Sequence, residues 1–285
     1  MRLATRNHGL PLEALAYDVT PPGLHYLLIH YDIPVVDPAR WRLEVDGSVR
    51  HQLSLSLEEL RLRPAVTCSV TLECAGNGRA YLSPRPLSQP WLLEAVGTAE
   101  WTGTPLRGVL EEAGVEDRAT EVLFRAIDRG VEGGEQQQFE RSLPLSDAVR
   151  EETLLAYAMN GQPLPPQHGF PLRLIVPGWY GMTSVKWLER ITVLATPFEG
   201  YQQRRGYRLR QTPEEDGEPV TRMLPRSLMI PPGIPDFATR ERRIELGSCT
   251  LRGRAWSGFG EVMRVEVSVD GGFSWSDARL GSQSS

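Results

Sequence analysis

The stretch VTLECAGNGR, residues 70–79, joins a buried-strand pattern to a glycine-rich turn that carries a cysteine and an arginine. The apolar run predicts a strand that ends at Glu73, and the two glycines predict a tight turn after it. Cys74 is therefore expected at the tip of a turn, beside Arg79 and exposed backbone N–H groups. Such a setting stabilises a thiolate, which is the form that attacks carbonyls or binds metals.

The three cysteines do not form a disulfide or zinc pattern. Cys68, Cys74 and Cys249 are odd in number, far apart in the sequence, and include no CxxC pair. Cys68 and Cys249 fall in strand-like patterns, where a free cysteine is expected to act as a small buried apolar residue. The loop setting of Cys74 favours a functional role for this residue.

The composition is that of a globular protein with an acidic balance. A chain of 285 residues can bury a sizeable core in one large domain or two modest ones. The net charge of −5 gives no basic footprint for nucleic acid. No apolar run approaches the ~20 residues of a membrane span. The start, MRLATRNHGLP, lacks the apolar stretch of a secretory signal, so we expect a cytoplasmic protein, or a periplasmic one if a leader has been removed.

Strand and helix patterns alternate without a regular βαβ order, which predicts an α+β fold. We expect strands over 41–49, 121–128 and 170–178, and a short helix over 56–60. The clearest helix has Thr104 as its N-cap, Pro105 as its first residue and Gly114 as its end. Its apolar face consists of Leu106, Val109, Leu110 and Ala113.

The character of the chain changes after Tyr207. Residues 209–240 are rich in proline and lack periodicity, as expected of a linker or an extended wrapping segment. Residues 263–269 alternate apolar with polar side chains, and the following DGG predicts a hairpin turn. We therefore place one domain at 1–208 and a second, with its linker, at 209–285.

Two classes of chemistry fit a functional Cys74. A cysteine hydrolase would pair it with a histidine, for which His168 has the best local context. Alternatively, a thiolate binds a redox-active metal, and nearby cationic side chains hold an anionic cofactor. The second class has support in TRNHGLP (5–11), HGFPLR (168–173) and SVKWLER (184–190), which place basic or imidazole groups in turns.

Six stretches together resemble the sulfite oxidase family of molybdenum-cofactor enzymes. They are TRNHGLP (5–11), TLECAGNGR (71–79), RAIDRG (125–130), NGQPLPPQHGFPLRLIVPGWYGMTSVKWLERI (160–191), YQQRRGY (201–207) and AWSGFGEVMRVEVSVDGGFSW (255–275). The resemblance implies a molybdopterin-binding catalytic domain followed by an immunoglobulin-like β-sandwich that makes a homodimer. Members continue beyond DGGFSW, so we expect this sandwich to be incomplete here.

The same resemblance implies a set of cofactor contacts. Cys74 matches the molybdenum ligand, a role that suits a soft thiolate. Arg173 and Lys186, the only lysine in the sequence, match positions that grip the cofactor phosphate. The remaining matching positions are Arg6, Asn7, His8, Asp128, His168, Ser184 and Val185.

The resemblance also implies a pocket for a small oxyanion, lined by Arg6, Arg79, Trp91 and Tyr207. Fixed guanidinium groups would hold the anion, and the phenol would donate a hydrogen bond. Tyr207 favours sulfite over nitrate, since related nitrate reductases usually lack it. Glu261 stands where the family often has an arginine, and an acid there would repel sulfite unless it points elsewhere.

The implied reaction is the oxidation of sulfite to sulfate by oxygen-atom transfer. No haem-binding domain is evident, so the electrons are expected to pass to a separate acceptor such as a cytochrome. One alternative in the same fold is a molybdenum-dependent reductase of sulfoxides, although the arginines disfavour a neutral substrate. The cysteine hydrolase that uses Cys74 and His168 is the alternative from another class.

Overall fold

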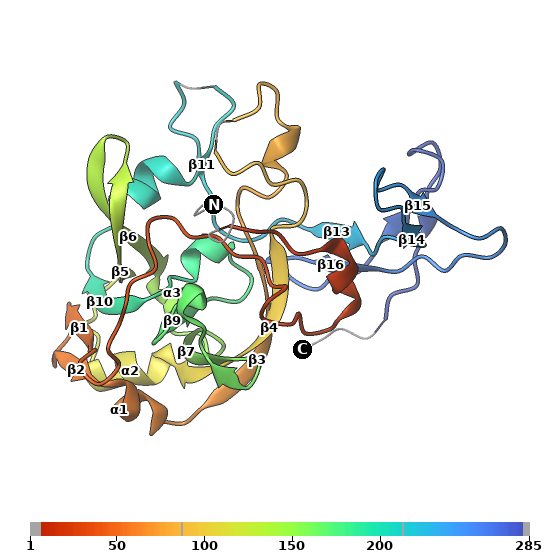
Figure 1. Cartoon of the computed structure of the whole chain (residues 1–285). Coiled ribbons are helices and arrows are strands. Elements are labelled where there is room, and N and C mark those ends of the chain that lie inside the picture. The colour runs from red at the N-terminus through yellow and green to blue at the C-terminus, as the bar shows by residue number, and fades with distance from the viewer. Residues whose placement is uncertain (1–6, 87, 213, 282–285) are drawn as a thin grey trace.

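Two five-stranded sheets carry the first part of the chain within the described residues, which are 7–86, 88–212 and 214–281 of the computed structural model (Figure 1). In one sheet, β1 and β10 are parallel and the other neighbours are antiparallel. Its strand order is β2–β1–β10–β5–β6, with bounds Leu53–Leu55, Leu43–Gly47, Leu188–Leu194, Glu121–Glu132 and Glu135–Pro144. The predicted α+β class is confirmed.

The second sheet supports the cysteine turn. Its strands β3, β4, β7 and β8 follow one another in that order, and β9 also pairs with β7. The bounds are Val66–Glu73, Val96–Pro105, Leu154–Met159, Gln162–Pro163 and Arg173–Ile175. Because β3 ends at Glu73, Cys74 is the first residue beyond the strand, as the sequence predicts. The Cys74 N–H still donates to the Ala95 carbonyl at 2.9 Å, which anchors the start of the turn to the chain just before β4.

Local signals account for the helices α1, α2 and α3, which span Leu57–Arg61, Leu106–Ala113 and Leu145–Ala148. Helix α1 begins with a capping box in which Ser56 and Glu59 satisfy each other's backbone N–H. Helix α2 begins one residue later than predicted, because Thr104 and Pro105 still belong to β4 and the Thr104 hydroxyl donates to the Leu60 carbonyl. Among the described residues, no helix is long and apolar enough to span a membrane.

The apolar face of α2 packs into the largest core cluster. All four predicted face residues are at most 1% exposed, and they belong to the same buried cluster as side chains of β1, β5 and β10. Gly114 ends the helix in the left-handed region, with φ of 70°, as its position predicts.

The segment after Tyr207 wraps around the first part of the chain. The Val220 N–H donates to the Tyr207 carbonyl at 3.1 Å, and the Tyr180 N–H donates to the Thr221 carbonyl at 3.0 Å. The Met223 N–H donates to the Gly178 carbonyl at 2.9 Å. Of the two sequence alternatives, the wrapping segment is therefore confirmed over 220–223.

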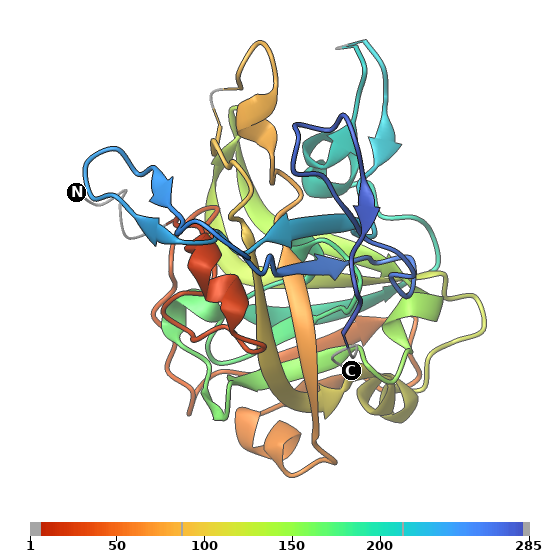
Figure 2. The same ribbon diagram turned by 90° about the vertical axis from the view of Figure 1, so that its right-hand side faces the viewer.

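The described residues beyond 207 form two-stranded ribbons. Strand β11 (Arg208–Leu209) pairs with β12 (Glu218–Pro219), and β13 (Arg226–Met229) pairs with β16 (Gly253–Trp256). Strand β14 (Ile234–Pro235) pairs with β15 (Arg242–Arg243), and β17 (Glu266–Val267) pairs with β18 (Ser276–Asp277). Figures 1 and 2 show the β14–β15 hairpin projecting from the body of the molecule. The strand predicted over 263–269 is limited to Glu266–Val267, where β18 supplies the partner, and Val269 is 83% exposed. The expectation that Cys249 is buried in a strand is wrong, because it lies exposed in an irregular segment.

Replacing Leu110 by alanine should lower the free energy of unfolding by about 2–5 kcal/mol, because the side chain is 1% exposed and leaves a cavity in the main core. Urea denaturation followed by circular dichroism measures this loss. Leu62→Ala is the control, since that side chain is 81% exposed. Equal losses in the two variants would contradict the assigned core.

Candidate active site

The turn after β3 is built around Cys74. The Asn77 N–H donates to the Cys74 carbonyl at 2.9 Å, and the Gly76 N–H points at the Cys74 Sγ at 3.4 Å. Gly78 adopts φ of 89°, which favours glycine. A Cβ at Gly76 would lie 3.0 Å from the Arg79 guanidinium carbon. Glycines at 76 and 78 therefore allow the turn to close and the arginine to lie against it.

The surroundings of the Cys74 thiol have opposing effects on its pKa. Burial raises the pKa, whereas the Gly76 N–H, the Arg79 cation and the Trp91 indole lower it. Burial prevails, since the residue is 9% exposed. The turn N–H and Arg79 thus favour the thiolate, as the sequence predicts, but burial outweighs their effect. A bound metal ion would supply the missing positive charge, because a coordinating thiol is deprotonated outright.

Cys74 lines a pocket with an empty volume of about 630 Å³, which includes the part open to solvent. The pocket brings together residues from β3, β5, β9, the loop before β10 and the end of the turn at 202–206. Eight predicted site residues line it: Cys74, Asp128, His168, Arg173, Ser184, Val185, Lys186 and Tyr207.

Arg173 braces one wall of this pocket. Its two terminal nitrogens donate to the His168 carbonyl at 3.0 Å and to the Ser184 carbonyl at 2.9 Å. Its guanidinium carbon lies 4.6 Å from the centre of the Trp101 ring, a cation–π contact. The Arg173 Nε is buried and has no hydrogen-bond partner among the described residues.

Lys186 places a second cation, half-buried, near Arg173. Its Nζ donates to the Leu28 carbonyl at 2.7 Å and to the Gln167 carbonyl at 3.2 Å. Burial and the Arg173 charge lower the pKa of Lys186 well below its usual value. Burial raises the pKa of Asp128 to about 6, although the Lys186 charge opposes this shift. The pocket therefore holds more positive than negative charge in a poorly solvated space.

Three titratable side chains that line the pocket were not predicted from the sequence: His25, Tyr26 and His30. The rings of His25 and His168 meet edge to face at 5.5 Å. Burial lowers the pKa of His25 to about 4 and that of His168 to about 2, so both imidazoles are neutral at pH 7. A usable signal is the stretch HYLLIHY, which holds two of the five histidines of the sequence within six residues.

Tyr207 is fixed at the pocket by its hydroxyl and its ring. Its OH and the His30 Nε2 are 2.5 Å apart, and the Arg141 guanidinium lies 5.4 Å from the ring centre. Burial raises the pKa of Tyr207, so the phenol is protonated at neutral pH. Arg79 lies close enough to lower the pKa values of both Tyr207 and Cys74. The charge of Arg79 therefore acts on both the Cys74 thiol and the Tyr207 phenol.

Some predicted site residues do not line the described pocket. Asn7 and His8 instead support the segment that carries His25 and His30: the Ile29 N–H donates to the Asn7 Oδ1 at 2.7 Å, and the His8 backbone pairs with Leu27. Arg79 and Trp91 are joined through the Ala80 N–H, which donates to the Trp91 carbonyl at 2.9 Å. Glu261 is exposed and is not among the described lining residues. Arg6 lies outside the described residues.

Comparisons with known families assign both parts of the chain. Residues 30–202 match the oxidoreductase molybdopterin binding domain, and residues 235–285 match the Mo-co oxidoreductase dimerisation domain. The mitochondrial sulfite oxidase of Mus musculus is 39% identical over 273 residues, which cover 92% of this chain and 49% of that protein. The sulfite oxidase of Arabidopsis thaliana is 34% identical over 277 residues, which cover 91% of this chain and 70% of that protein.

The chain belongs to the sulfite oxidase family of molybdenum-cofactor oxidoreductases. A solved structure, the sulfane dehydrogenase SoxCD from Paracoccus pantotrophus, superposes with a TM-score of 0.80 at 28% identity and covers 97% of this chain and 68% of that one. The nitrate reductase [NAD(P)H] of Hordeum vulgare is 34% identical over 90% of this chain and 31% of that protein. This family member spans about half the length of the mammalian relatives it matches.

The pocket fits the molybdenum cofactor of the family. Arg173 and Lys186 repel each other in the protein alone, and a phosphate would relieve that repulsion. The unpartnered Arg173 Nε leaves one buried donor for further contact. Among the described residues no three His, Cys, Asp or Glu side chains are grouped to hold a metal ion. The donor set at Cys74 suits a metal that is also held by the dithiolene sulfurs of a pterin.

Family membership gives no support to the cysteine-hydrolase alternative. A hydrolase would use His168 as a base near neutral pH, which requires a pKa in that range. The pKa of His168 is instead lowered to about 2 by burial and by neighbouring His25, Arg173 and Lys186. His168 therefore lines the pocket as a neutral imidazole.

Asp128→Asn should change how stability depends on pH in the cofactor-free chain. The folded-state pKa of about 6 lies above the ordinary 3.8, so folding favours the protonated form and the wild type loses stability as the pH rises from about 4 to about 6. Relative to the variant, this loss should reach up to about 3 kcal/mol. Urea denaturation at pH 4, 5, 6 and 7 measures it, and a difference that does not change with pH would contradict the assignment.

Proposed function

We propose that this family member oxidises a sulfur oxyanion by oxygen-atom transfer, with sulfite as the expected substrate. The observation that carries the proposal is the shared environment of Cys74, Arg79 and Tyr207, in which a candidate metal ligand lies near a cation and a protonated phenol. A guanidinium suits an oxyanion, and a phenol adds one hydrogen bond. The names of the sulfite oxidases and of the sulfane dehydrogenase also support a sulfur substrate.

The protein groups in this proposal bind and orient. Arg79 is half-buried beside the cysteine turn, where its charge attracts the anion. Tyr207 is fixed by His30, so its oxygen has a defined position at the pocket. Trp91 is 6% exposed and its carbonyl accepts from the Ala80 N–H, so this tryptophan is buried beside the segment that carries Arg79. We keep Arg6 as a proposed fourth substrate contact.

Cys74 would hold the metal of the molybdenum cofactor, while Arg173, Lys186 and the neutral histidines would hold its pterin and phosphate. When bound, the cofactor supplies the oxygen atom and accepts two electrons. We propose that these electrons pass to a separate protein such as a cytochrome, and that the chain pairs as a homodimer through its second part, which matches the dimerisation domain. Arg79 disfavours a neutral sulfoxide as substrate, since its charge would have no anionic partner.

Purified protein should contain about one molybdenum and one pterin per chain, because each chain offers one Cys74 turn. Cys74→Ser should abolish sulfite oxidation with little loss of thermal stability, since the side chain lies on a turn. Metal analysis, an assay with an artificial electron acceptor and a melting curve test this. Cys249→Ser is the matched control at an exposed cysteine in an irregular segment. Full activity of Cys74→Ser would contradict the proposal.

Arg79→Ala should lower kcat/KM for sulfite by about 10–150-fold, mainly through a higher KM, because one charge-assisted hydrogen bond is lost. Tyr207→Phe should cost less, since a single neutral donor is removed. Steady-state kinetics over a range of sulfite concentrations measures both. Arg85→Ala, at an exposed arginine six residues further along the chain, is the control. Unchanged sulfite kinetics in the first two variants, with losses on another substrate, would show that the substrate assignment is wrong.

A further inference from the structure

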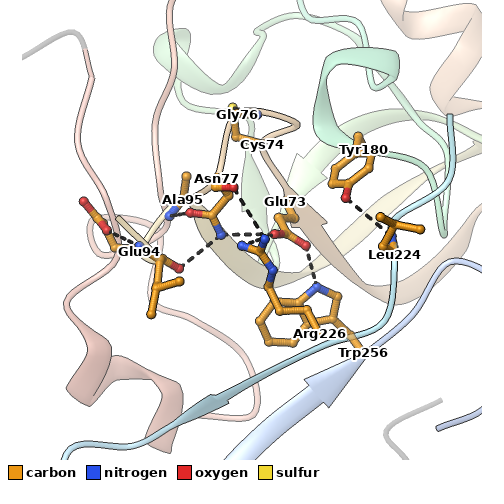
Figure 3. A network of polar contacts seen from close by, with 11 residues as sticks. Glu73, Cys74, Gly76, Asn77, Glu94, Ala95, Tyr180, Leu224, Arg226 and Trp256 are labelled. Carbon is orange, nitrogen blue, oxygen red and sulfur yellow. Dashed lines mark hydrogen bonds and ion pairs between the residues drawn. The ribbon is translucent and has the colours of Figure 1, made fainter. Parts of the chain in front are cut away.

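The residue before Cys74 carries a fully buried carboxylate. Glu73 is 0% exposed, and its oxygens contact three side chains (Figure 3). The Trp256 Nε1 donates to Oε2 at 2.8 Å, Arg226 forms an ion pair with Oε1 at 2.8 Å, and the Asn77 Nδ2 donates to Oε1 at 3.1 Å. Two of these partners come from the ribbon β13–β16, at the far end of the sequence.

One cross-strand pair delivers both of the distant partners. Arg226 and Trp256 are directly opposite each other in the β13–β16 ribbon. Trp256 also packs in an apolar cluster with Leu10, Leu15 and Val96, which fixes the ribbon against the first part of the chain. When this ribbon packs against the first part of the chain, it therefore places both a cation and an N–H donor at Glu73.

The ribbon contacts the cysteine turn on both sides of Cys74. Arg226 pairs with Glu73 and also donates to the Asn77 carbonyl at 3.4 Å, so it bridges the residue before Cys74 and the third residue after it. Asn77 is in turn fixed to the chain before β4, since its Oδ1 accepts from the Ala95 N–H and its Nδ2 donates to the Leu93 carbonyl, both at 3.1 Å. Figure 3 shows Arg226 and Trp256 approaching Glu73 together, with Asn77 beside them on the turn.

A buried carboxylate needs these partners. Removing one partner of a buried ion pair leaves a charge without compensation, and the surrounding chain must then shift to reach solvent or another donor. The carboxylate is attached to the residue from which Cys74 leaves β3. A shift of Glu73 therefore changes the direction of the cysteine turn before it disturbs the sheet behind it.

We propose that Arg226 and Trp256 are positioning residues for Cys74: by holding Glu73 and Asn77, the β13–β16 ribbon fixes the direction in which the thiol points. The importance of this positioning for catalysis rests on the proposed role of Cys74 as the metal ligand. The effect of the ribbon on the Cys74 thiol can be tested in the protein without its cofactor. The C-terminal part thereby contributes to the active site without contacting substrate.

The test compares alkylation of two cysteines in the full-length chain before cofactor loading. Trp256→Phe removes the N–H donor but keeps an aromatic ring in the apolar cluster. Iodoacetamide labelling of Cys74, followed by mass spectrometry, should become at least about tenfold faster, the lower end of the range expected when a hydrogen bond to a charged group is lost. Labelling of Cys68, which is half-buried on the same strand β3, should not change.

Matched variants separate positioning from general destabilisation. Trp275→Phe and Arg243→Met change the same residue types elsewhere in the C-terminal part and should leave Cys74 labelling at the wild-type rate. Arg226→Met should accelerate labelling, and Arg226→Lys, which keeps the cation, should restore part of the protection. An equal rise at Cys68 and Cys74 would indicate global loosening and overturn the proposal, as would unchanged labelling of Cys74.

A second readout separates this inference from the proposed function. Molybdenum retained per chain after dialysis of loaded protein should fall in Trp256→Phe and remain in Trp275→Phe. If molybdenum bound to Cys74→Ser shows the same number of sulfur ligands in X-ray absorption as in the wild type, then Cys74 is not the ligand and the proposed function fails. The labelling result would still decide whether the ribbon positions the turn.

Discussion

The burial of the Glu73 carboxylate is the constraint on which the active-site end of the molecule depends. Burial raises the pKa of this group, and Trp256, Arg226 and Asn77 oppose the shift by stabilising the ionised form. Trp256 is 183 residues away in the sequence. The two parts of the chain must therefore come together before the carboxylate is satisfied, so the cysteine turn acquires its final geometry as a consequence of their packing.

The pocket lined by Cys74 also contains charges that are hydrogen-bonded without an oppositely charged partner among the described residues, and here they are cations. Arg173 and Lys186 are held by backbone carbonyls rather than by acidic side chains, so their charges are hydrogen-bonded but not neutralised. Neutral histidines surround them, because burial disfavours further positive charge. The result is a polar wall with a surplus of positive charge among the described residues. A phosphate-bearing cofactor completes the charge balance at little cost in reorganisation.

The parts of the fold that the sequence predicts are those governed by neighbours along the chain. The apolar face of α2, its end at Gly114 and the end of β3 before Cys74 follow from local periodicity and turn chemistry. The alternation over 263–269 does not produce a strand of that length, because a strand also needs a partner and β18 pairs with only two residues. The lowered pKa of His30 likewise depends on burial that no local pattern specifies.

The residues of the candidate site also fall into two groups: those that the sequence predicts and those that depend on tertiary packing. Most residues named through the family resemblance line one pocket, although they are spread over more than 130 residues of sequence, from Cys74 to Tyr207. The Glu73 contacts were not predicted, since Glu73, Arg226 and Trp256 look like ordinary strand residues when each is seen with its neighbours. Their meaning appears only when register places Arg226 opposite Trp256 and tertiary packing brings both to one carboxylate. A part of the chain that matches a dimerisation domain can thus also shape the catalytic turn, because an event that moves the β13–β16 ribbon must move a partner of the residue next to Cys74.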